Sequence, residues 1–433
     1  MKERKSRYAV REHRNFLLAL WGVGVSKLAH YLFSFAMGLY VLRQTGSAQS
    51  FALTVCISLL PSALLSPIVG TLADRVSKKV LIVGADLLNA LVMFSVFLYS
   101  LTAPLSVEVV YLATFLLSVL GPFVGITFSS ATPRLVGDGT IPKLISMKSA
   151  VESFIQIAAP VIGGLVYAVV DIELFVLGAG VAFLLSGISE LWIDYNFNPL
   201  LTEAGAAPAP RESMLASLGA GARFLCSKDY LMVAAIASLA INFMFSGFDA
   251  LFPYSLLQLL HLSESSYGVV MGAIPAGMLL GAVFLSRRSV TLTRPLLVRA
   301  VLGFSVFCFL MILPFVLGLG GELAVSAYYV VTTFVLGLII AIINISASVF
   351  LQTVVPGELL GRVSGLFAMA SMLVTPVGVM LFGTLADYVH PGYLFAASGA
   401  GLCITALLFN RTRVLDLKIA QMEQSDTSSE AAA

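Results

Sequence analysis

The sequence predicts an all-α membrane protein with twelve transmembrane helices in two pseudosymmetric six-helix bundles. Three observations predict this fold. Of the 433 residues, 59% are apolar and only 11% are charged, a composition that would leave large apolar surfaces exposed in water. Twelve apolar runs are each long enough to cross a bilayer. Basic residues recur at every second connection between these runs.

The twelve runs are continuously apolar, which favours helices, because barrel strands alternate polar and apolar residues. In lipid, each helix satisfies its own backbone polar groups. A helix of about 20 residues crosses about 30 Å of hydrocarbon. We expect helices over residues 16–41, 51–72, 80–101, 107–129, 150–170, 174–193, 231–256, 268–286, 296–319, 323–350, 365–385 and 392–409.

The basic residues test this count independently. Of the 25 Lys and Arg residues, 23 lie near the termini or in alternate connections. This bias predicts that both termini face the cytoplasm, which requires an even number of crossings. We therefore expect a multi-pass protein of the cell membrane.

A drop in hydrophobicity divides the chain into halves. Residues 195–230, which include Pro199, Pro208 and Pro210, are typical of a linker. The predicted domains are an N-terminal bundle over residues 1–194, this cytoplasmic linker, a C-terminal bundle over residues 231–410 and a cytoplasmic tail over residues 411–433. Pro160 followed by Asp171 recurs as Pro376 followed by Asp387. Such duplication indicates a carrier with a binding site near mid-membrane, between the halves.

The connection after the second helix reads GTLADRVSKK over residues 70–79. This segment resembles the signature loop of the major facilitator superfamily, G-x-L-A-D-R-x-G-R-K, with Ser77 and Lys78 as the two departures. Gly70 would permit close helix packing, and the carboxylate of Asp74 would favour the positive N-terminal end of a neighbouring helix. An ordinary basic turn is the alternative interpretation.

The resemblance implies the major facilitator fold and alternating access. It also implies that Asp74 engages the eleventh helix, which begins near Ser364, and helps to hold an outward-open state. The predicted conformational gate comprises Gly70, Asp74, Arg75, Lys78 and Lys79.

The fifth helix contains AAPVIGG over residues 158–164, which is similar to the antiporter motif G-P-x-x-G-G of exporting branches of the superfamily. Pro160 would bend the helix, and Gly163 and Gly164 would allow two helices to approach closely. An antiporter-like hinge is the functional interpretation, and packing alone is the alternative. The loops over residues 133–136 and 355–363 resemble those of the macrolide-efflux and siderophore-exporter branch, which implies a bacterial exporter.

Few ionisable groups lie at membrane depth, and each is a functional candidate because burial in lipid is costly. Lys27 lies twelve residues beyond Asn15, or about 18 Å along a helix, too deep for its side chain to reach the surface. His30 shares its helix face, and Asp249 lies in the seventh helix. We expect these three residues to border a central cavity, where Asp249 could take up a proton. A fixed Lys27–Asp249 ion pair is the alternative.

Polar side chains elsewhere in the helices have two interpretations. Asn242, Asn344 and Gln156 would place hydrogen bonds in the cavity, or they would join helices directly. Four acidic residues near the cytoplasmic ends are expected to pair with Arg134, Arg75 or nearby lysines and so latch the gate, with substrate binding as the alternative; these are Asp86, Glu152, Glu190 and Asp194.

We interpret the chain as a secondary active transporter that exports small amphipathic, drug-like or macrolide-like compounds, by proton-coupled antiport. The alternatives are export of a siderophore or metabolite, or an uptake symporter on the same fold. The sequence has no phosphate-binding loop for an ATP-driven pump and no acid or metal cluster for a membrane enzyme. The expected partners are a small-molecule substrate, the lipid bilayer and a proton or other coupling ion. We expect a monomer without cofactor, metal or nucleic acid.

Overall fold

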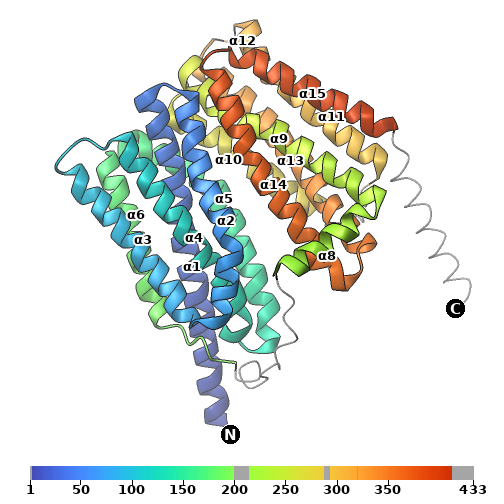
Figure 1. Cartoon of the computed structure of the whole chain (residues 1–433). Coiled ribbons are helices and arrows are strands. Elements are labelled where there is room, and N and C mark those ends of the chain that lie inside the picture. Colours follow the sequence, from blue (N-terminus) through green and yellow to red (C-terminus); the bar gives the residue numbers. More distant parts are fainter. Residues whose placement is uncertain (1, 199–213, 287–292, 319, 412–433) are drawn as a thin grey trace, which may run out of the picture. The chain divides into compact units, whose positions relative to one another are not determined.

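The computed structural model describes residues 2–198, 214–286, 293–318 and 320–411, and within these ranges it is helical without strands (Figure 1). Twelve of the described helices are long and apolar enough to cross a membrane, which confirms the predicted fold class. Several features of the sequence lie outside the described residues. They are the linker prolines, Arg211, Arg287, Arg288 and all of the tail after Arg411.

The chain divides into two compact units. The first comprises residues 1–210 and 263–272, and the second comprises residues 211–262 and 273–433. The boundary between residues 210 and 211 lies inside the segment predicted as a linker, and residues 263–272, which include the start of the predicted span 268–286, belong to the first unit.

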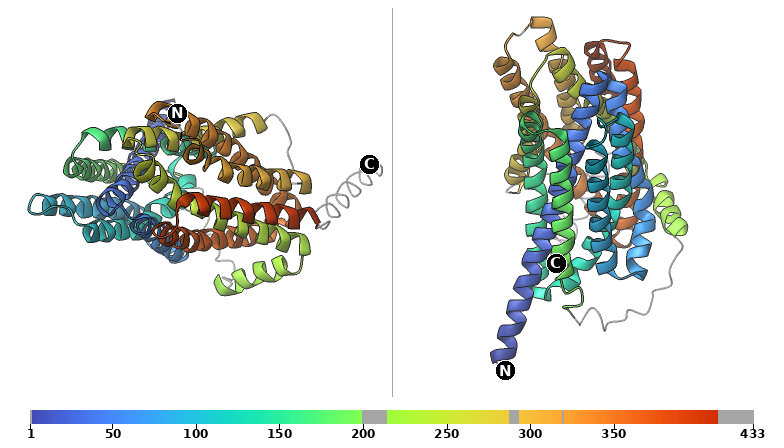
Figure 2. Two further views of the ribbon diagram at one scale, coloured as in Figure 1. Left: turned by 90° about the horizontal axis from the view of Figure 1, so that it is seen from above. Right: turned by 90° about the vertical axis from the view of Figure 1, so that its left-hand side faces the viewer.

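The first unit contains six long helices: α1 (Lys2–Thr45), α2 (Ala48–Arg75), α3 (Lys78–Ser100), α4 (Val107–Leu135), α5 (Ile141–Val169) and α6 (Ile172–Leu191). A short 3-10 turn, η1 (Asp138–Thr140), precedes α5. Ser47 and Ser106 cap α2 and α4 by accepting hydrogen bonds from backbone amides in the first turn. The N-terminal turns of α1 project beyond the other helices of this unit (Figure 2).

The second unit begins with α8 (Met214–Cys226), which lies within the segment predicted as a linker. Its long helices are α9 (Asp229–Tyr254), α10 (Glu264–Leu285), α11 (Arg294–Leu310), α13 (Glu322–Val354), α14 (Gly357–Ala386) and α15 (Pro391–Arg411). A π-helical turn, η2 (Ser255–Leu259), continues α9, and the short α12 (Leu313–Leu317) follows α11. The first turns of α10 belong to the first unit.

The two units repeat one pattern of helix pairing. In the first unit α1 packs on α5 and α6, and α3 packs on α6. In the second unit α9 packs on α14 and α15, and α11 packs on α15. The same order of elements therefore builds both bundles, as expected of an internal repeat.

The apolar core of the first unit is interrupted at one level. One cluster of buried apolar residues includes Val23 on α1 and Ala85 on α3. A second includes Ala29 on α1 and Ala90 on α3. Between the two clusters the buried side chains are polar, and they include Ser26, Asp86 and Asn89.

Candidate functional site

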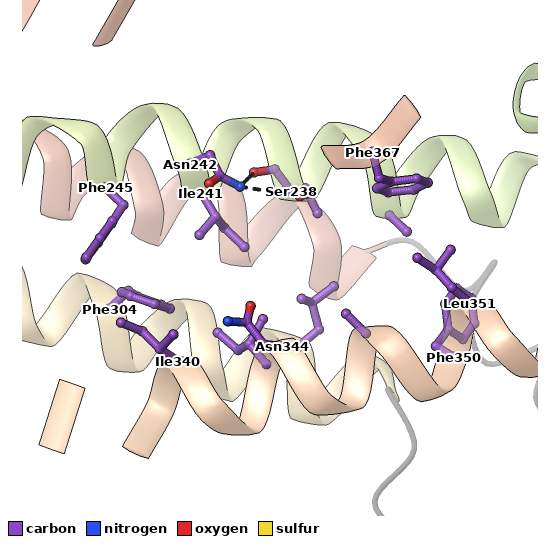
Figure 3. Close-up of a pocket in the computed structure, with 15 residues that line it drawn as sticks. Ser238, Ile241, Asn242, Phe245, Phe304, Ile340, Asn344, Phe350, Leu351 and Phe367 are labelled. Atoms are coloured by element: carbon purple, nitrogen blue, oxygen red, sulfur yellow. Dashed lines mark hydrogen bonds between the residues drawn. The ribbon is translucent and has the colours of Figure 1, made fainter. Parts of the chain in front are cut away.

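A largely apolar cavity of about 270 Å³ lies within the second unit, between α9, α11, α13 and α14 (Figure 3). Four phenylalanines contribute to its wall: Phe245, Phe304, Phe350 and Phe367. Its few polar side chains are Ser238, Asn242 and Asn344. Aromatic walls with a few polar groups suit an apolar ligand that carries isolated hydrogen-bonding groups.

Two predicted cavity residues, Asn242 and Asn344, line this cavity. The amide nitrogen of Asn242 donates a hydrogen bond of 2.8 Å to the carbonyl oxygen of Ser238, and it lies 3.4 Å from the hydroxyl of Ser371 on α14. Asn242 therefore also joins two helices. Asn344 extends from α13 between the cavity walls and is exposed (Figure 3), so its amide is available to a ligand.

A more polar cavity of about 470 Å³ lies within the first unit, between α1, α2, α3, α4 and α6. Lys27 and His30 line it, as do Asn89 and five serines: Ser26, Ser34, Ser58, Ser62 and Ser66. The structure thus brings two of the predicted site residues into one cavity, together with hydroxyl groups that the sequence had not singled out.

Lys27 has a carboxylate partner inside the first unit. Its ammonium nitrogen lies 2.6 Å from Oε1 of Glu152 on α5, and both side chains are about one quarter to one third exposed. Lys148 lies 3.9 Å from the same oxygen and donates a hydrogen bond to Ser129 on α4. Glu152 therefore pairs with lysines, as expected, and the partner of Lys27 is on α5.

Asp249 and Gln156 are not among the residues that line either cavity. Asp249 is half-buried on α9, one turn beyond Phe245, and it makes no hydrogen bond or ion pair with the residues that the structure describes. Gln156 is exposed on α5. A shared central cavity for Lys27, His30 and Asp249 stays a prediction.

The predicted gate segment connects α2 and α3 and contacts two further helices. The ammonium of Lys78 donates to the Ala73 carbonyl and, at 2.9 Å, to the Ser130 hydroxyl on α4. The ammonium of Lys79 lies 2.5 Å from the carbonyl of Leu191 at the end of α6. Arg75 is exposed, and the Asp74 side chain lies outside the described part of the chain. The two lysines thus hold the connection against α4 and α6.

Close packing at Gly70 was expected but is not seen within the first unit. A Cβ added to Gly70 would meet no atom of the described residues within 4 Å, so no described helix of this unit requires a glycine there. The sequence motif could not show this, because close packing depends on what faces the residue.

The glycines of α5 do make close helix contacts. A Cβ on Gly163 would lie 2.9 Å from the ring of Phe35 on α1. A Cβ on Gly164 would clash with the carbonyl oxygen of Glu264, and one on Gly268 with the carbonyl oxygen of Pro160. The first turns of α10 therefore cross α5 at backbone contact, beside the helical Pro160.

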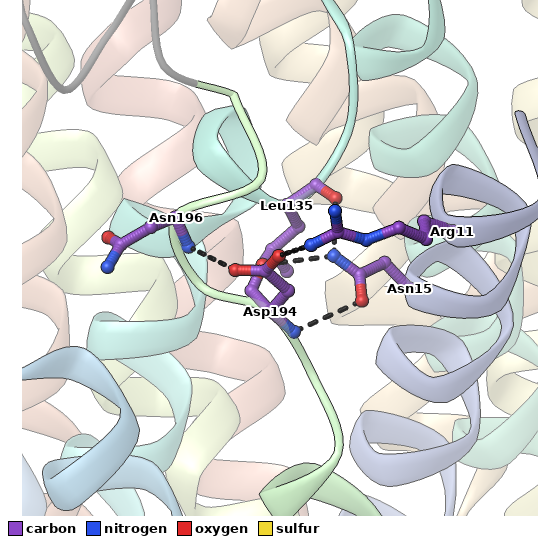
Figure 4. A network of polar contacts seen from close by, with 5 residues as sticks. All are labelled: Arg11, Asn15, Leu135, Asp194 and Asn196. Atoms are coloured by element: carbon purple, nitrogen blue, oxygen red, sulfur yellow. Dashed lines mark hydrogen bonds and ion pairs between the residues drawn. The ribbon is translucent and has the colours of Figure 1, made fainter. Parts of the chain in front are cut away.

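A polar network closes the end of the first unit that holds the N-terminus, which we call the N-terminal end (Figure 4). The Arg11 guanidinium lies 2.7 Å from the Asp194 carboxylate. The buried Asn15 amide donates to the carbonyl oxygens of Leu135 and Asp194, at 3.0 and 2.9 Å. Asp194 was expected to pair with Arg134, Arg75 or a lysine; its partner is Arg11, because the segment after α6 folds against α1.

Two other acidic residues correct the sequence prediction more strongly. Asp86 and Glu190 have 0% of their surface exposed, and neither forms an ion pair with a described basic residue. They were expected to bind gate arginines or lysines, but both point into the bundle. The spacing of Asp86 with Asn89 and of Ser186 with Glu190 places polar groups on one face of each helix, a signal that could have indicated their burial.

Comparisons with known proteins agree with this architecture. The family model described as Major Facilitator Superfamily matches residues 19–378. Macrolide efflux protein A of Streptococcus pyogenes is 25% identical over 417 residues, which cover 92% of this chain and 97% of that protein. Enterobactin exporter EntS of Escherichia coli is 29% identical over 346 residues, or 78% and 77% of the two chains. These relatives are transporters and not enzymes.

A solved structure supports the fold. The peptide transporter POT, crystallised with sulfate, superposes with a TM-score of 0.69 at 13% identity, and the match covers 93% of this chain and 95% of that one. At this level of identity the likeness concerns the fold alone.

Proposed function

Because this chain belongs to the major facilitator superfamily, we propose that it is a secondary active exporter of small amphipathic organic compounds, with macrolide-like molecules as the leading substrate class. The observation that carries this proposal is the phenylalanine-lined cavity of the second unit, in which Asn242 and Asn344 supply isolated polar groups. The similarity to a macrolide efflux protein along nearly the whole of both chains supports the same substrate class.

The orientation follows from the distribution of basic residues. With 23 of 25 Lys and Arg residues near the termini or in alternate connections, both termini face the cytoplasm of a bacterial cell. The protein acts as a monomer in the cell membrane. In this orientation the N-terminal end of the first unit, with Lys78 and Lys79, faces the anionic inner leaflet.

Alternating access uses the gate and the hinge. The backbones of α5 and the first turns of α10 are in contact, which supports a hinge at Pro160, Gly163 and Gly164. At such a crossing the two helices can tilt against each other only if no side chain lies between them, and glycine meets this condition. The bonds of Lys78 and Lys79 to α4 and α6 support a gate role for residues 70–79.

Proton antiport supplies the energy. One proton that moves inward releases about 2.3 kcal/mol per 100 mV of membrane potential, so a few protons drive a useful substrate gradient. Asp249 is the coupling residue in the second unit. Its half-buried position without a described ion pair supports this role, since an isolated carboxyl group in an apolar setting takes up a proton more readily than an exposed one.

The direct test uses inside-out membrane vesicles and a radiolabelled macrolide. We expect wild-type vesicles to accumulate the macrolide when their interior is made acidic. Asp249→Asn should lose most of this pH-driven accumulation, by about tenfold or more if one coupling proton is removed. Asp229→Asn is the matched control, because Asp229 is exposed at the start of the same helix.

Two results would contradict the proposal. Vesicles that fail to accumulate macrolides under any imposed ion gradient would exclude macrolide export, and full pH-driven transport by Asp249→Asn would exclude that residue from coupling. Siderophore export is the second candidate, because the similarity to an enterobactin exporter covers three quarters of the chain. Accumulation of enterobactin without accumulation of macrolides would favour it.

A further inference from the structure

Two buried carboxyl groups meet inside the first unit, where α1, α3 and α6 come together. Asp86 on α3 accepts a hydrogen bond of 2.8 Å from the hydroxyl of Ser26 on α1. Its Cβ would lie 3.4 Å from a Cβ added to Gly187 on α6. Glu190 on α6 lies against α1, since a Cβ on Gly22 would be 2.9 Å from its Cγ and Oε1. Gly22 and Ser26 are one turn apart, so the two carboxyl groups lie beside adjacent turns of α1.

Three of the four carboxyl oxygens of this pair lack a hydrogen-bond partner among the described residues. One oxygen of Asp86 and both oxygens of Glu190 are buried and accept no hydrogen bond in the described part of the protein. The Asn89 side-chain oxygen and the Tyr195 hydroxyl are also buried without a partner. Ser26, Ser186, Asn89 and Tyr195 are the polar groups that face the pair. None carries a positive charge.

An ionised carboxylate pair is unfavourable in this setting. Each buried charge without a counter-ion costs several kcal/mol, and two like charges in one site disfavour each other further. Groups coupled in this way lose their protons in two separate steps that belong to the pair. Buried oxygens with neither a cation nor a donor therefore indicate a bound proton.

The pair also lies between two cavities. Ser26 and Asn89 line the polar cavity of the first unit. On the other side, Tyr195 lines a separate cavity of about 510 Å³ at the N-terminal end, together with Lys78, Lys79 and Arg134. Burial and the nearby carboxyl groups of Glu190 and Asp86 raise the pKa of the Tyr195 hydroxyl, which therefore stays protonated and can donate. Polar groups thus lie on both sides of the pair, in the Lys27 cavity and toward the N-terminal end.

We propose that Asp86 and Glu190 form a proton-binding site of the first unit that exchanges its proton with the Lys27 cavity on one side and with the N-terminal end on the other. On binding, a hydronium ion beside the pair gives up its proton: one of its O–H bonds breaks, a water molecule remains, and an O–H bond forms on a carboxylate oxygen. On release, that O–H bond breaks and a water molecule on the opposite side takes the proton as hydronium. Proton binding rests on the buried pair alone; its use in antiport rests on the proposed function.

Infrared titration of the purified full-length protein tests the site without a substrate. The carbonyl stretch of a protonated carboxylic acid is distinct from the bands of carboxylates, and the spectrum of the double variant Asp86→Asn/Glu190→Gln is subtracted from that of the wild type. We expect two ionisation steps in the difference spectrum, with a protonated carboxyl group present at neutral pH. Each single variant should lose one of the two steps. Asp194→Asn, which removes a carboxylate paired with Arg11, should lose neither.

Other outcomes overturn the site. A single ionisation step at acidic pH, as for exposed carboxyl groups, would show that the pair binds no proton at neutral pH. Carboxylate bands that shift when Na⁺ or Ca²⁺ is added at neutral pH would show a metal-cation site instead. If the double variant does not fold, the two single variants against the wild type give the same answer.

The experiments distinguish failure of the proposed export function from failure of the proposed proton-binding site. Wild-type vesicles that export no macrolide would refute the proposed function and leave the titration result unchanged. If the wild type exports macrolides, we expect the double variant to lose the dependence of export on the pH gradient. Export by the double variant with the wild-type pH dependence would refute exchange of this proton during transport.

Discussion

The two units share one order of helix pairing but enclose different cavities. In the first unit Lys27, His30, Asn89 and five serines face the cavity, whereas in the second unit phenylalanines and isoleucines dominate. Helix pairing depends on the packed faces, in which most buried residues are apolar or small in both units. The residues that line a cavity make fewer contacts between helices, so they can differ between the two units without changing the fold. One bundle is suited to charged groups and the other to apolar ligands.

The contrast extends to the buried contact between corresponding helices. In the first unit, α3 and α6 contribute Asp86 and Glu190. In the second unit, α11 and α15 pack through the Ser305 hydroxyl, which donates a hydrogen bond of 2.7 Å to the Gly399 carbonyl. Residues 294–310 and 391–411, which form these two helices, contain no Asp or Glu. The buried acidic pair is therefore a property of one unit and not of the repeated fold.

The ion pair of the first cavity should show the largest effect of a single lining residue. Lys27→Met leaves the partly buried Glu152 carboxylate with Lys148 at 3.9 Å, and we expect a loss of about 1–3 kcal/mol in the free energy of unfolding. Adding Glu152→Gln should recover part of this loss. The measurement is a double-mutant cycle on unfolding in detergent, with an expected coupling of about 0.5–3 kcal/mol.

Arg43→Met is the control for that cycle. Arg43 is 3.3 Å from Glu264 and its side chain is 71% exposed, so its loss should change stability by less than about 1 kcal/mol. Equal losses of stability for the two substitutions would mean that the Lys27–Glu152 ion pair stabilises the protein no more than an exposed ion pair. The charged cavity would then not differ from the protein surface in the strength of its ion pairs.

The aromatic wall of the second cavity should affect ligand affinity. Phe304→Ala removes a ring from the wall, and we expect apparent macrolide affinity to fall by roughly fivefold, or about 1 kcal/mol. Phe309→Ala is the matched control on the same helix, because Phe309 is 47% exposed and does not line the cavity. The apparent affinity of each variant is measured from the dependence of vesicle uptake on macrolide concentration. A smaller loss of affinity for Phe304→Ala than for Phe309→Ala would exclude this cavity as the macrolide site.

The sequence was sufficient for the fold but only partly for the site. Length and continuous hydrophobicity determine a membrane span, so all twelve spans could be predicted. Depth along a helix could be estimated as well, which singled out Lys27. The direction of each side chain could not be predicted, because it depends on the orientation of each helix about its own axis relative to its neighbours. For this reason Asp86 and Glu190 were expected at a charged surface and are buried, and Gly70 was expected at a helix contact that the described residues of the first unit do not provide.

The smallest effect is expected for Arg11 at the N-terminal end, where this exposed residue and a buried one serve the same network. The Arg11 side chain is 61% exposed, so Arg11→Ala should cost less than about 1 kcal/mol, and salt should screen most of that. Asn15 is buried and bonds the Leu135 and Asp194 backbones, so Asn15→Ala should cost about 1–3 kcal/mol. Thermal unfolding in detergent at low and high salt separates them. A salt-insensitive loss for Arg11→Ala that matches the loss for Asn15→Ala would mean that the ion pair, and not the buried amide, holds this end closed.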